Sequence, residues 1–353
     1  MKKEGKIFRA IGLMSGTSLD GLDIVAAEFW QQNGNWCFKI VSAETAIYTA
    51  EWFEKLKTAH TLAGDKLLIL NNQYGRFLGQ EAKKFCHKTG FNPDLIASHG
   101  HTVFHDPEKG FTFQLGNGNE IAATTGITTV ADFRTGDVAL GGQGAPLVPA
   151  GDKLLFYEYD YCLNLGGFSN ISFDENDARK AFDICPVNIV FNEFASKRGH
   201  LFDNNGDFGR AGEIDFHLLD KLNSLDFYQK QFPKSLGREW VEQVFLPVFH
   251  LHSCAENNKI RTVYEHVALQ ISKTILPHKN VLATGGGVWN KFLIELIASK
   301  TTAKIIIPAA EIADFKEALV FAFLGVLKTN NQVNCFASVT GAKHDHSAGT
   351  IFN

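Results

Sequence analysis

The chain has 353 residues, of which 45% are hydrophobic and 20% charged, and its formal net charge is −4. This length exceeds what one hydrophobic core usually serves, so we expect two domains. The slightly acidic balance argues against a nucleic acid or a membrane surface as partner, because both attract basic patches. Six scattered cysteines without a CxxC pair, and no apolar run long enough for a signal peptide or a membrane span, predict a cytoplasmic protein with reduced thiols.

The first part of the chain reads as a β-hairpin followed by mixed elements. Lys6–Met14 and Leu22–Phe29 are strand-like and flank a turn rich in Gly, Ser, Thr and Asp. Further along we expect a helix at Asp65–Phe85, strands at Pro93–Ser98 and Gly126–Asp132, and a Gly/Pro-rich loop at Asp137–Asp152 that crosses between domains or lines a cleft.

The second part repeats the opening pattern. Tyr161–Phe173 again reads as strand, Gly-rich turn and strand, a weak internal echo that indicates a duplicated architecture. We then expect, in order, helix Val263–Ile275, strand Val281–Ala283, helix Trp289–Ser299, strand Lys304–Ile307 and helix Phe315–Leu327. Alternating strands and helices predict an α/β fold.

The turn MSGTSLDGLD at Met14–Asp23 is the first candidate site. Gly16 and Gly21 let the backbone approach a ligand, and successive N–H groups in such a turn bind anions. Asp20 and Asp23 are suited to Mg²⁺, directly or through water. Leu22 stands where a P-loop has its lysine, so the turn is not a P-loop. By itself the motif leaves a plain hairpin turn and a phosphate nest equally open.

Two further glycine-rich turns follow strands. LNLGGFSN at Leu163–Asn170 offers two glycines with Ser169 and Asn170, and ATGGGVWNK at Ala283–Lys291 opens a helix N-terminus. Each turn alone is often structural. Together with the first turn they favour a phosphate clamp.

Three other features carry side-chain chemistry. His99, His101 and His105 lie in HGHTVFH, where a polar cleft strand is favoured over a zinc site. Asp183 in AFDICPVN is a candidate general base, with a structural role the alternative. Arg134 is suited to bidentate binding of an anionic group or to a surface ion pair.

Together these segments resemble the anhydro-N-acetylmuramic acid kinases of bacterial cell-wall recycling. The shared motifs run in the family's order from residue 12 to about 342, and MSGTSLDGLD and DVALGGQGAPLVPA are the most specific. The resemblance implies a two-domain actin-like ATPase (ribonuclease H-like) fold with an active site in the interdomain cleft. It implies domains at 1–132 plus about 337–353 and at 133–336, an ATP and Mg²⁺ requirement, an amino-sugar substrate and a homodimer. Water would open the 1,6-anhydro ring at C1 while O6 takes the γ-phosphoryl group, giving N-acetylmuramic acid 6-phosphate.

The resemblance also implies residue roles. Asp183 matches the aspartate that activates the water, and Asp20 and Asp23 are the candidate Mg²⁺ ligands. The implied nucleotide contacts are Gly16, Thr17, Ser18, Leu19, Asp20, Gly21, Leu22, Asp23, Gly166, Gly167, Ser169, Asn170, Gly285, Gly286, Gly287 and Asn290. The implied sugar contacts are His99, Arg134, Gly142, Gln143, Ala145, Pro146, Asn188 and Glu317.

The chain departs from the family's usual motifs mainly on the sugar side. The departures are His101 for Gln, Ile184, Cys185 and Val187 for Thr and two Gly, Gly116-Asn117-Gly118 for Gly-Asp-Pro, and Gly151-Asp152 for Phe-His. They leave open a kinase of the same fold that acts on another sugar. A second alternative is an actin-like ATPase that switches a protein partner.

Overall fold

The computed structural model describes residues 6–16 and 19–353, and the chain divides into two compact units. Unit 1 comprises Met1–Tyr157 and Phe315–Asn353, and unit 2 comprises Glu158–Asp314. These bounds differ from the expected ones at 132/133 and 336/337. Residues 133–157 and 315–336 belong to unit 1, where the rings of Phe133 and Phe321 lie 5.5 Å apart.

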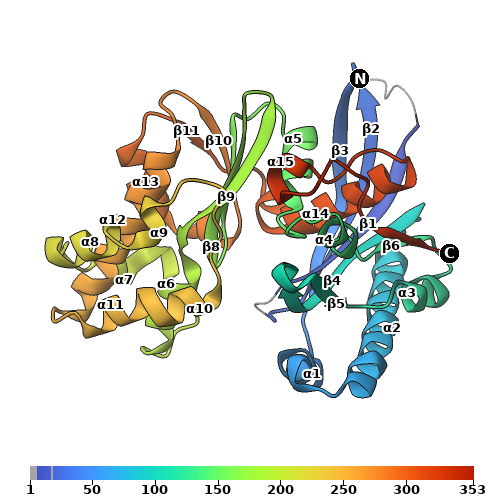
Figure 1. Ribbon diagram of the computed structural model, residues 1–353, viewed down its shortest axis with the longest axis horizontal. Coiled ribbons are helices and arrows are strands. Elements are labelled where there is room, and N and C mark those ends of the chain that lie inside the picture. Colours follow the sequence, from blue (N-terminus) through green and yellow to red (C-terminus); the bar gives the residue numbers. More distant parts are fainter. Residues whose placement is uncertain (1–5, 17–18) are drawn as a thin grey trace. The chain divides into compact units, whose positions relative to one another are not determined.

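Unit 1 is built on a seven-stranded sheet in the order β12-β6-β4-β1-β2-β3, with β5 paired to β4 (Figure 1). The strands β1, β2 and β3 are antiparallel neighbours, whereas β4 runs parallel to β1 and β6 parallel to β4. The strands are β1 (Phe8–Ser15), β2 (Leu22–Gln32), β3 (Asn35–Ala46), β4 (Leu95–Asp106), β5 (Phe111–Leu115), β6 (Thr129–Ala131) and β12 (Thr350–Phe352).

Both faces of β1 are covered, which explains its apolar sequence. Ile11 and Leu13 share a buried cluster with Tyr74 of α2. Gly12 points to the opposite face, where a Cβ would lie 1.9 Å from the carbonyl oxygen of Ala318 in α14. Only glycine permits this approach of strand and helix. The helices and part-helices of unit 1 are α1 (Ala50–Thr58), α2 (Gly64–Thr89), α3 (Gly118–Thr125), α4 (Thr135–Ala139), α5 (Val148–Leu155), α14 (Ala310–Thr329, from Phe315 on) and α15 (Ala337–Thr340).

Unit 2 repeats the strand order of unit 1 around a five-stranded sheet, β11-β10-β7-β8-β9. Three antiparallel strands are followed by two strands parallel to the first. The same order in both units confirms the predicted duplication and the actin-like α/β fold. The strands are β7 (Tyr161–Leu165), β8 (Phe168–Glu175), β9 (Ala178–Pro186), β10 (Asn280–Thr284) and β11 (Lys304–Ile306).

A helical layer built largely on α12 covers the sheet of unit 2, and its core includes Val263, Val267 and Ile271. The helices of this unit are α6 (Asn188–Ser196), α7 (Asp207–Arg210), α8 (Phe216–Asn223), α9 (Asp226–Gln229), α10 (Arg238–Trp240), α11 (Leu246–Leu251), α12 (Glu256–Thr274) and α13 (Lys291–Lys300). Across residues 6–16 and 19–353, none of the helices combines the length and apolar character that a membrane crossing requires.

Two sequence expectations need correction. The strand expected at Pro93–Ser98 continues as β4 to Asp106, because the histidine run pairs with β5. The expected loop at Asp137–Asp152 contains the start of α5, whose Pro149 fits the first helical turn, where no N–H partner is needed.

Candidate active site

The first glycine-rich turn closes the hairpin of β1 and β2, with Ser15 paired to Leu22. A Cβ on Gly21 would lie 2.5 Å from Thr45 Cγ2 and 2.9 Å from the carbonyl oxygen of Ala46. The backbone therefore passes so close to β3 that only glycine fits. The Leu19 N–H contacts the Gly16 carbonyl at 3.4 Å. Thr17 and Ser18 lie outside the described residues.

The carboxylates predicted to hold Mg²⁺ lie beside this turn. Asp23 Oδ1 accepts a hydrogen bond from Thr45 Oγ1 at 2.6 Å. The pKa of the Tyr48 phenol is raised, mainly by burial, and the negative charges of Asp23 and Asp20 raise it further, so both carboxylates act on the Tyr48 hydroxyl through the electric field. Carboxylate oxygens are the ligands that Mg²⁺ prefers, so the donor set fits this ion.

A buried chain of hydrogen bonds runs through Ser15, the residue that precedes the turn. Tyr74 and Tyr48 hydroxyls lie 2.7 Å apart, the Tyr48 hydroxyl donates to Ser15 Oγ at 2.7 Å, and Ser15 Oγ lies 3.1 Å from Nδ1 of His101. All four side chains are at most 8% exposed. Burial lowers the pKa of His101 to about 4, so the imidazole is neutral, and its Nδ1 shares a hydrogen bond with the Ser15 hydroxyl. This chain fixes the start of the turn to α2 and β4.

Arg134 is anchored through His99 and Gly144. Its Nε and Nη2 lie 3.0 and 2.8 Å from Nε2 of His99, and its Nη1 donates to the Gly144 carbonyl at 3.1 Å. His99 and His101 therefore face different partners, and they do not form the zinc pair that their spacing left open. Gly100 between them has a φ of 73°, which turns the chain.

The buried Asp137 carboxylate holds the loop Gly142–Pro146 in place. The Gly144 N–H donates to Asp137 Oδ2 at 2.7 Å, and a Cβ on Gly142 would lie 2.2 Å from the same oxygen. Gln143 donates its N–H to Thr340 O at 2.8 Å, and its side chain is exposed, as is Pro146. Ala145 between them is half-buried.

Glu317 lies on α14 close to Arg134. Burial raises the pKa of Glu317, and the positive charges of Lys316 and Arg134 oppose that rise. Lys316 Nζ forms a buried ion pair with Asp152 at 3.1 Å. These contacts account for the departure at Gly151-Asp152. A Cβ on Gly151 would lie 2.5 Å from Val320, so α5 and α14 pack closely only because this residue is glycine. The next residue, Asp152, is the ion-pair partner of Lys316.

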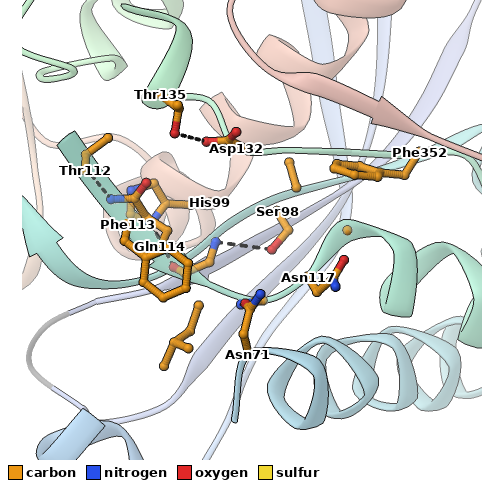
Figure 2. A pocket seen from close by; sticks show the side chains of 15 residues that line it. Asn71, Ser98, His99, Thr112, Phe113, Gln114, Asn117, Asp132, Thr135 and Phe352 are labelled. Atoms are coloured by element: carbon orange, nitrogen blue, oxygen red, sulfur yellow. Dashed lines mark hydrogen bonds between the residues drawn. The ribbon is translucent and has the colours of Figure 1, made fainter. Parts of the chain in front are cut away.

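A pocket of about 240 Å³ in unit 1 is lined by His99 together with other polar and apolar side chains. Figure 2 shows Asn71 of α2 and Asn117 before α3 on one side, with Gln114 of β5 and Asp132 among the other lining side chains. Asn71 Oδ1 accepts the Gly116 N–H at 2.8 Å, so it holds the segment that departs from the family's Gly-Asp-Pro.

In unit 2, Asp183 lies near the end of β9 and is held by the backbone of an adjacent loop. Leu236 donates its N–H to Asp183 Oδ2 at 2.8 Å, and Asp183 donates its own N–H to the Lys234 carbonyl at 3.1 Å. Burial raises the pKa of Asp183 to about 6, against the lowering effect of the Leu236 N–H. A carboxyl group with this pKa is ionised at neutral pH and accepts a proton more readily than an ordinary aspartate.

The second and third glycine-rich turns meet in unit 2. A Cβ on Gly285 would lie 2.6 Å from Asn164 Oδ1, and one on Gly287 would lie 2.8 Å from Leu165. Gly286 between them and Gly167 of the neighbouring turn have no atom within 4 Å of a Cβ position. Gly285 and Gly287 thus let the two turns pack together, whereas Gly286 and Gly167 leave backbone that a ligand could approach.

Several predicted contact residues also have partners within unit 2. Ser169 is fully buried and its hydroxyl donates to the Cys185 carbonyl at 3.1 Å. Asn290 caps α13 by accepting the Leu293 N–H and donates to Tyr264 OH at 2.6 Å. Asn188 Nδ2 donates to the Leu165 carbonyl at 3.3 Å. The predicted ligand contacts of these side chains stay predictions, and their observed hydrogen bonds shape the turns.

One residue in the site was not singled out from the sequence. Asn164 on β7 is paired with Asn170 on β8, which is paired with Asp183 on β9, so the three side chains share one face of the sheet. The available signal was a lone polar residue in the apolar strand YCLNL.

Comparison with known proteins agrees with the motifs. The family model for anhydro-N-acetylmuramic acid kinase matches residues 8–353. The protein of that name from Pseudomonas fluorescens is 34% identical over 373 residues, which cover 97% of this chain and 98% of the relative. The one from Pseudomonas savastanoi pv. phaseolicola is 32% identical over 374 residues, which cover 98% of this chain and 99% of the relative. The protein of that name from Haemophilus influenzae is 32% identical, with 97% of both chains covered. The chain therefore belongs to the anhydro-N-acetylmuramic acid kinase family.

Proposed function

We propose that this protein is an ATP-dependent kinase that hydrolytically opens 1,6-anhydro-N-acetylmuramic acid and phosphorylates O6, yielding N-acetylmuramic acid 6-phosphate and ADP. Family membership across residues 8–353 supports this activity. The observation that carries the mechanism is the half-buried Asp183, whose pKa of about 6 suits a general base at neutral pH.

In the proposed step, a water molecule attacks C1 of the sugar and transfers a proton to the Asp183 carboxylate. The C1–O6 bond breaks, O6 attacks the γ-phosphorus of ATP, and ADP leaves with the electron pair of the broken P–O bond. Leu236 orients Asp183 through its N–H, and Arg134, fixed by His99, orients the sugar. Phosphoryl transfer needs mainly positioning and charge stabilisation, which backbone N–H groups of the glycine-rich turns supply.

The finer assignments are part of the proposal. The turn at 16–23 and those at 165–170 and 285–287 would bind ATP, and Asp20 and Asp23 would hold Mg²⁺, which neutralises phosphate charge when bound. The sugar would contact His99, Arg134, the loop Gly142–Pro146, Asn188 and Glu317. We further propose a homodimer and a cytoplasmic location.

A coupled ADP-release assay tests the activity. It compares 1,6-anhydro-N-acetylmuramic acid with N-acetylmuramic acid, and mass spectrometry and NMR locate the phosphate on the product. We expect turnover of the anhydro sugar with phosphate at O6. Preferred turnover of N-acetylmuramic acid would instead establish a kinase for another sugar, which the altered FDICPVN segment leaves as the second candidate. ATP hydrolysis that needs no sugar would indicate an ATPase switch.

A further inference from the structure

Two short pairs of residues whose side chains can bind metal ions lie among the helices of unit 2. They belong to other elements than β9, which carries Asp183. Asp215 and His217 stand at the start of α8, and His252 and Cys254 stand in the link between α11 and α12. Each pair has the spacing i, i+2. Neither pair is a metal motif by itself, and only the packing of α8 beside α11 and α12 brings them together.

The ligand atoms of three of these residues are clustered. Nε2 of His252 lies 3.1 Å from Oδ2 of Asp215, and one ligand atom each of Asp215, His252 and Cys254 lie within 4.8 Å of one another. The rings of His217 and His252 are 5.6 Å apart. The His252 side chain is only 8% exposed, whereas His217 is exposed, so an ion can reach the cluster from solvent.

This geometry suits a tetrahedral ion. Zinc binds Asp oxygen, His nitrogen and Cys sulfur at about 2.0–2.3 Å, so tetrahedral ligand atoms stand roughly 3.3–3.8 Å apart. The observed separations among Asp215, His252 and Cys254 need only small side-chain adjustments to reach that range. The exposed His217 lies outside this group of three, and its ring would have to turn toward them to bind the same ion. The second carboxylate oxygen, Oδ1 of Asp215, accepts the Leu218 N–H at 2.9 Å and thereby orients the carboxylate.

We propose that Asp215, His252 and Cys254, with His217 as the fourth ligand, form a Zn²⁺ site in unit 2. A thiolate and two imidazoles favour zinc over Mg²⁺, which prefers oxygen ligands. The site is structural: it ties the N-terminus of α8 to the link that precedes α12. It is separate from the predicted Mg²⁺ ligands, which lie in unit 1.

A second cluster of the same residue types serves as an internal comparison. In unit 1, Asp137, Cys335 and His346 also place ligand atoms within 4.8 Å of one another. There the Asp137 carboxylate is fully buried and accepts hydrogen bonds from Thr340 and from the Gly144 N–H. Asp137 is committed to the loop it supports, and Cys335 Sγ donates to Oδ1 of the same carboxylate at 3.2 Å.

The test is a titration of the chelator-treated full-length protein with Co²⁺, a spectroscopic substitute for zinc. We expect one tightly bound Co²⁺ per chain, with visible absorption typical of tetrahedral cobalt and a sulfur-to-cobalt charge-transfer band that Zn²⁺ abolishes. Cys254→Ser should remove the charge-transfer band, and His252→Ala should weaken binding at least about tenfold. Cys335→Ser, the matched control, should leave both signals unchanged.

Stability and activity give independent readouts. Zn²⁺ at about 100 times its Kd should raise the unfolding temperature of unit 2 by roughly 5–10 °C in the wild type and not in Cys254→Ser. Kinase turnover by Cys254→Ser should match that of the wild type. An octahedral cobalt spectrum, or a charge-transfer band that persists in Cys254→Ser and disappears in Cys335→Ser, would overturn the proposal.

Discussion

Two nitrogens of the Arg134 guanidinium converge on a single acceptor, Nε2 of His99, at 3.0 and 2.8 Å. The other ring nitrogen, Nδ1, lies 2.9 Å from the Gly100 carbonyl and therefore carries the imidazole proton. Burial and the Arg134 charge hold the pKa of His99 well below its usual range. His99 thus acts as a neutral support that aims the guanidinium.

This support predicts a selective defect in Arg134→Lys. Lysine cannot form the planar fork that spans His99 and Gly144, so the cation shifts. We expect the KM for the anhydro sugar to rise at least about tenfold, which is about 1.4 kcal/mol of lost binding, while the KM for ATP stays unchanged. Steady-state kinetics measures both. Arg210→Lys, a change in a surface ion pair with Glu295, is the control. An unchanged sugar KM would remove Arg134 from the sugar site.

Asp183 sets the acid limb of the proposed pH profile. A base must be ionised to accept a proton, and burial raises the pKa of Asp183 to about 6. In the free enzyme, kcat/KM should therefore fall about tenfold per pH unit below 6. Asp183→Asn should fold, bind ATP and lose about 10²–10⁴-fold in turnover. Near wild-type turnover by this variant would exclude Asp183 as the base.

The raised pKa of Asp183 also predicts how stability depends on pH. Activity should rise with pH as Asp183 ionises, whereas the free energy of unfolding should fall. The folded-state pKa is raised above the unfolded value, so the folded protein binds the proton more tightly, and stability is lost as pH rises from about 4 through 6. Asp183→Asn removes this loss. It should raise the free energy of unfolding by about 1–3 kcal/mol at pH 7.5 and by much less at pH 4. Urea unfolding at the two pH values measures the difference, with Asp220→Asn on the surface of α8 as control. A gain that does not depend on pH would contradict the assigned cause.

The Ser15 hydrogen-bond chain predicts different outcomes for two replacements of His101. His101→Ala leaves the buried Ser15 hydroxyl without its imidazole partner, which costs about 1–3 kcal/mol and loosens the start of the turn. The KM for ATP should rise more than the KM for the sugar. His101→Gln restores a polar partner, since its amide can donate or accept, as in the usual family motif, and should recover most of the affinity for ATP. Equal kinetics of the Ala and Gln variants would show that this chain does not position the turn.

Adjacent glycines in the third turn provide a matched pair. A methyl group at Gly285 would lie 2.6 Å from Asn164 Oδ1, and its φ of 86° is unfavourable for alanine. Gly285→Ala should therefore destabilise unit 2, and thermal unfolding should show this as a lower unfolding temperature. Gly286→Ala meets no atom within 4 Å and should fold normally. If Gly286 faces ATP, as proposed, its alanine variant should raise the KM for ATP with no loss of stability. A normal KM would place the nucleotide elsewhere.

The long, regular parts of this fold were predictable because local patterns determine them. The helix expected at Asp65–Phe85 is observed as α2, and the echo between the two strand–turn–strand segments corresponds to a five-strand order that both units share. The short helices between β9 and α12 were not predicted, since most span eight residues or fewer and show too little of the helical period.

The contacts within the site depend on distant parts of the chain and were less predictable. The motifs located Asp183, but its donor Leu236 lies 53 residues away. The spacing of His99 and His101 suggested a shared face, whereas the positive φ of Gly100 sends the rings to separate partners. Likewise, Asp215 and Cys254 have no common motif, because tertiary packing alone brings them together.

The contact between Gly12 and Ala318 also has a consequence for biosynthesis. Residues 8–15 leave the ribosome early, but α14, which covers one face of that strand, is made after nearly all of unit 2. At about 5–20 residues per second, the strands up to β6 wait roughly 10–40 s for α14, while unit 2 is contiguous and can fold as a unit. Chaperones that bind exposed apolar surface would meet the nascent chain during that interval. A premature stop before α14 would thus leave the early-made part of the protein with an unfinished core.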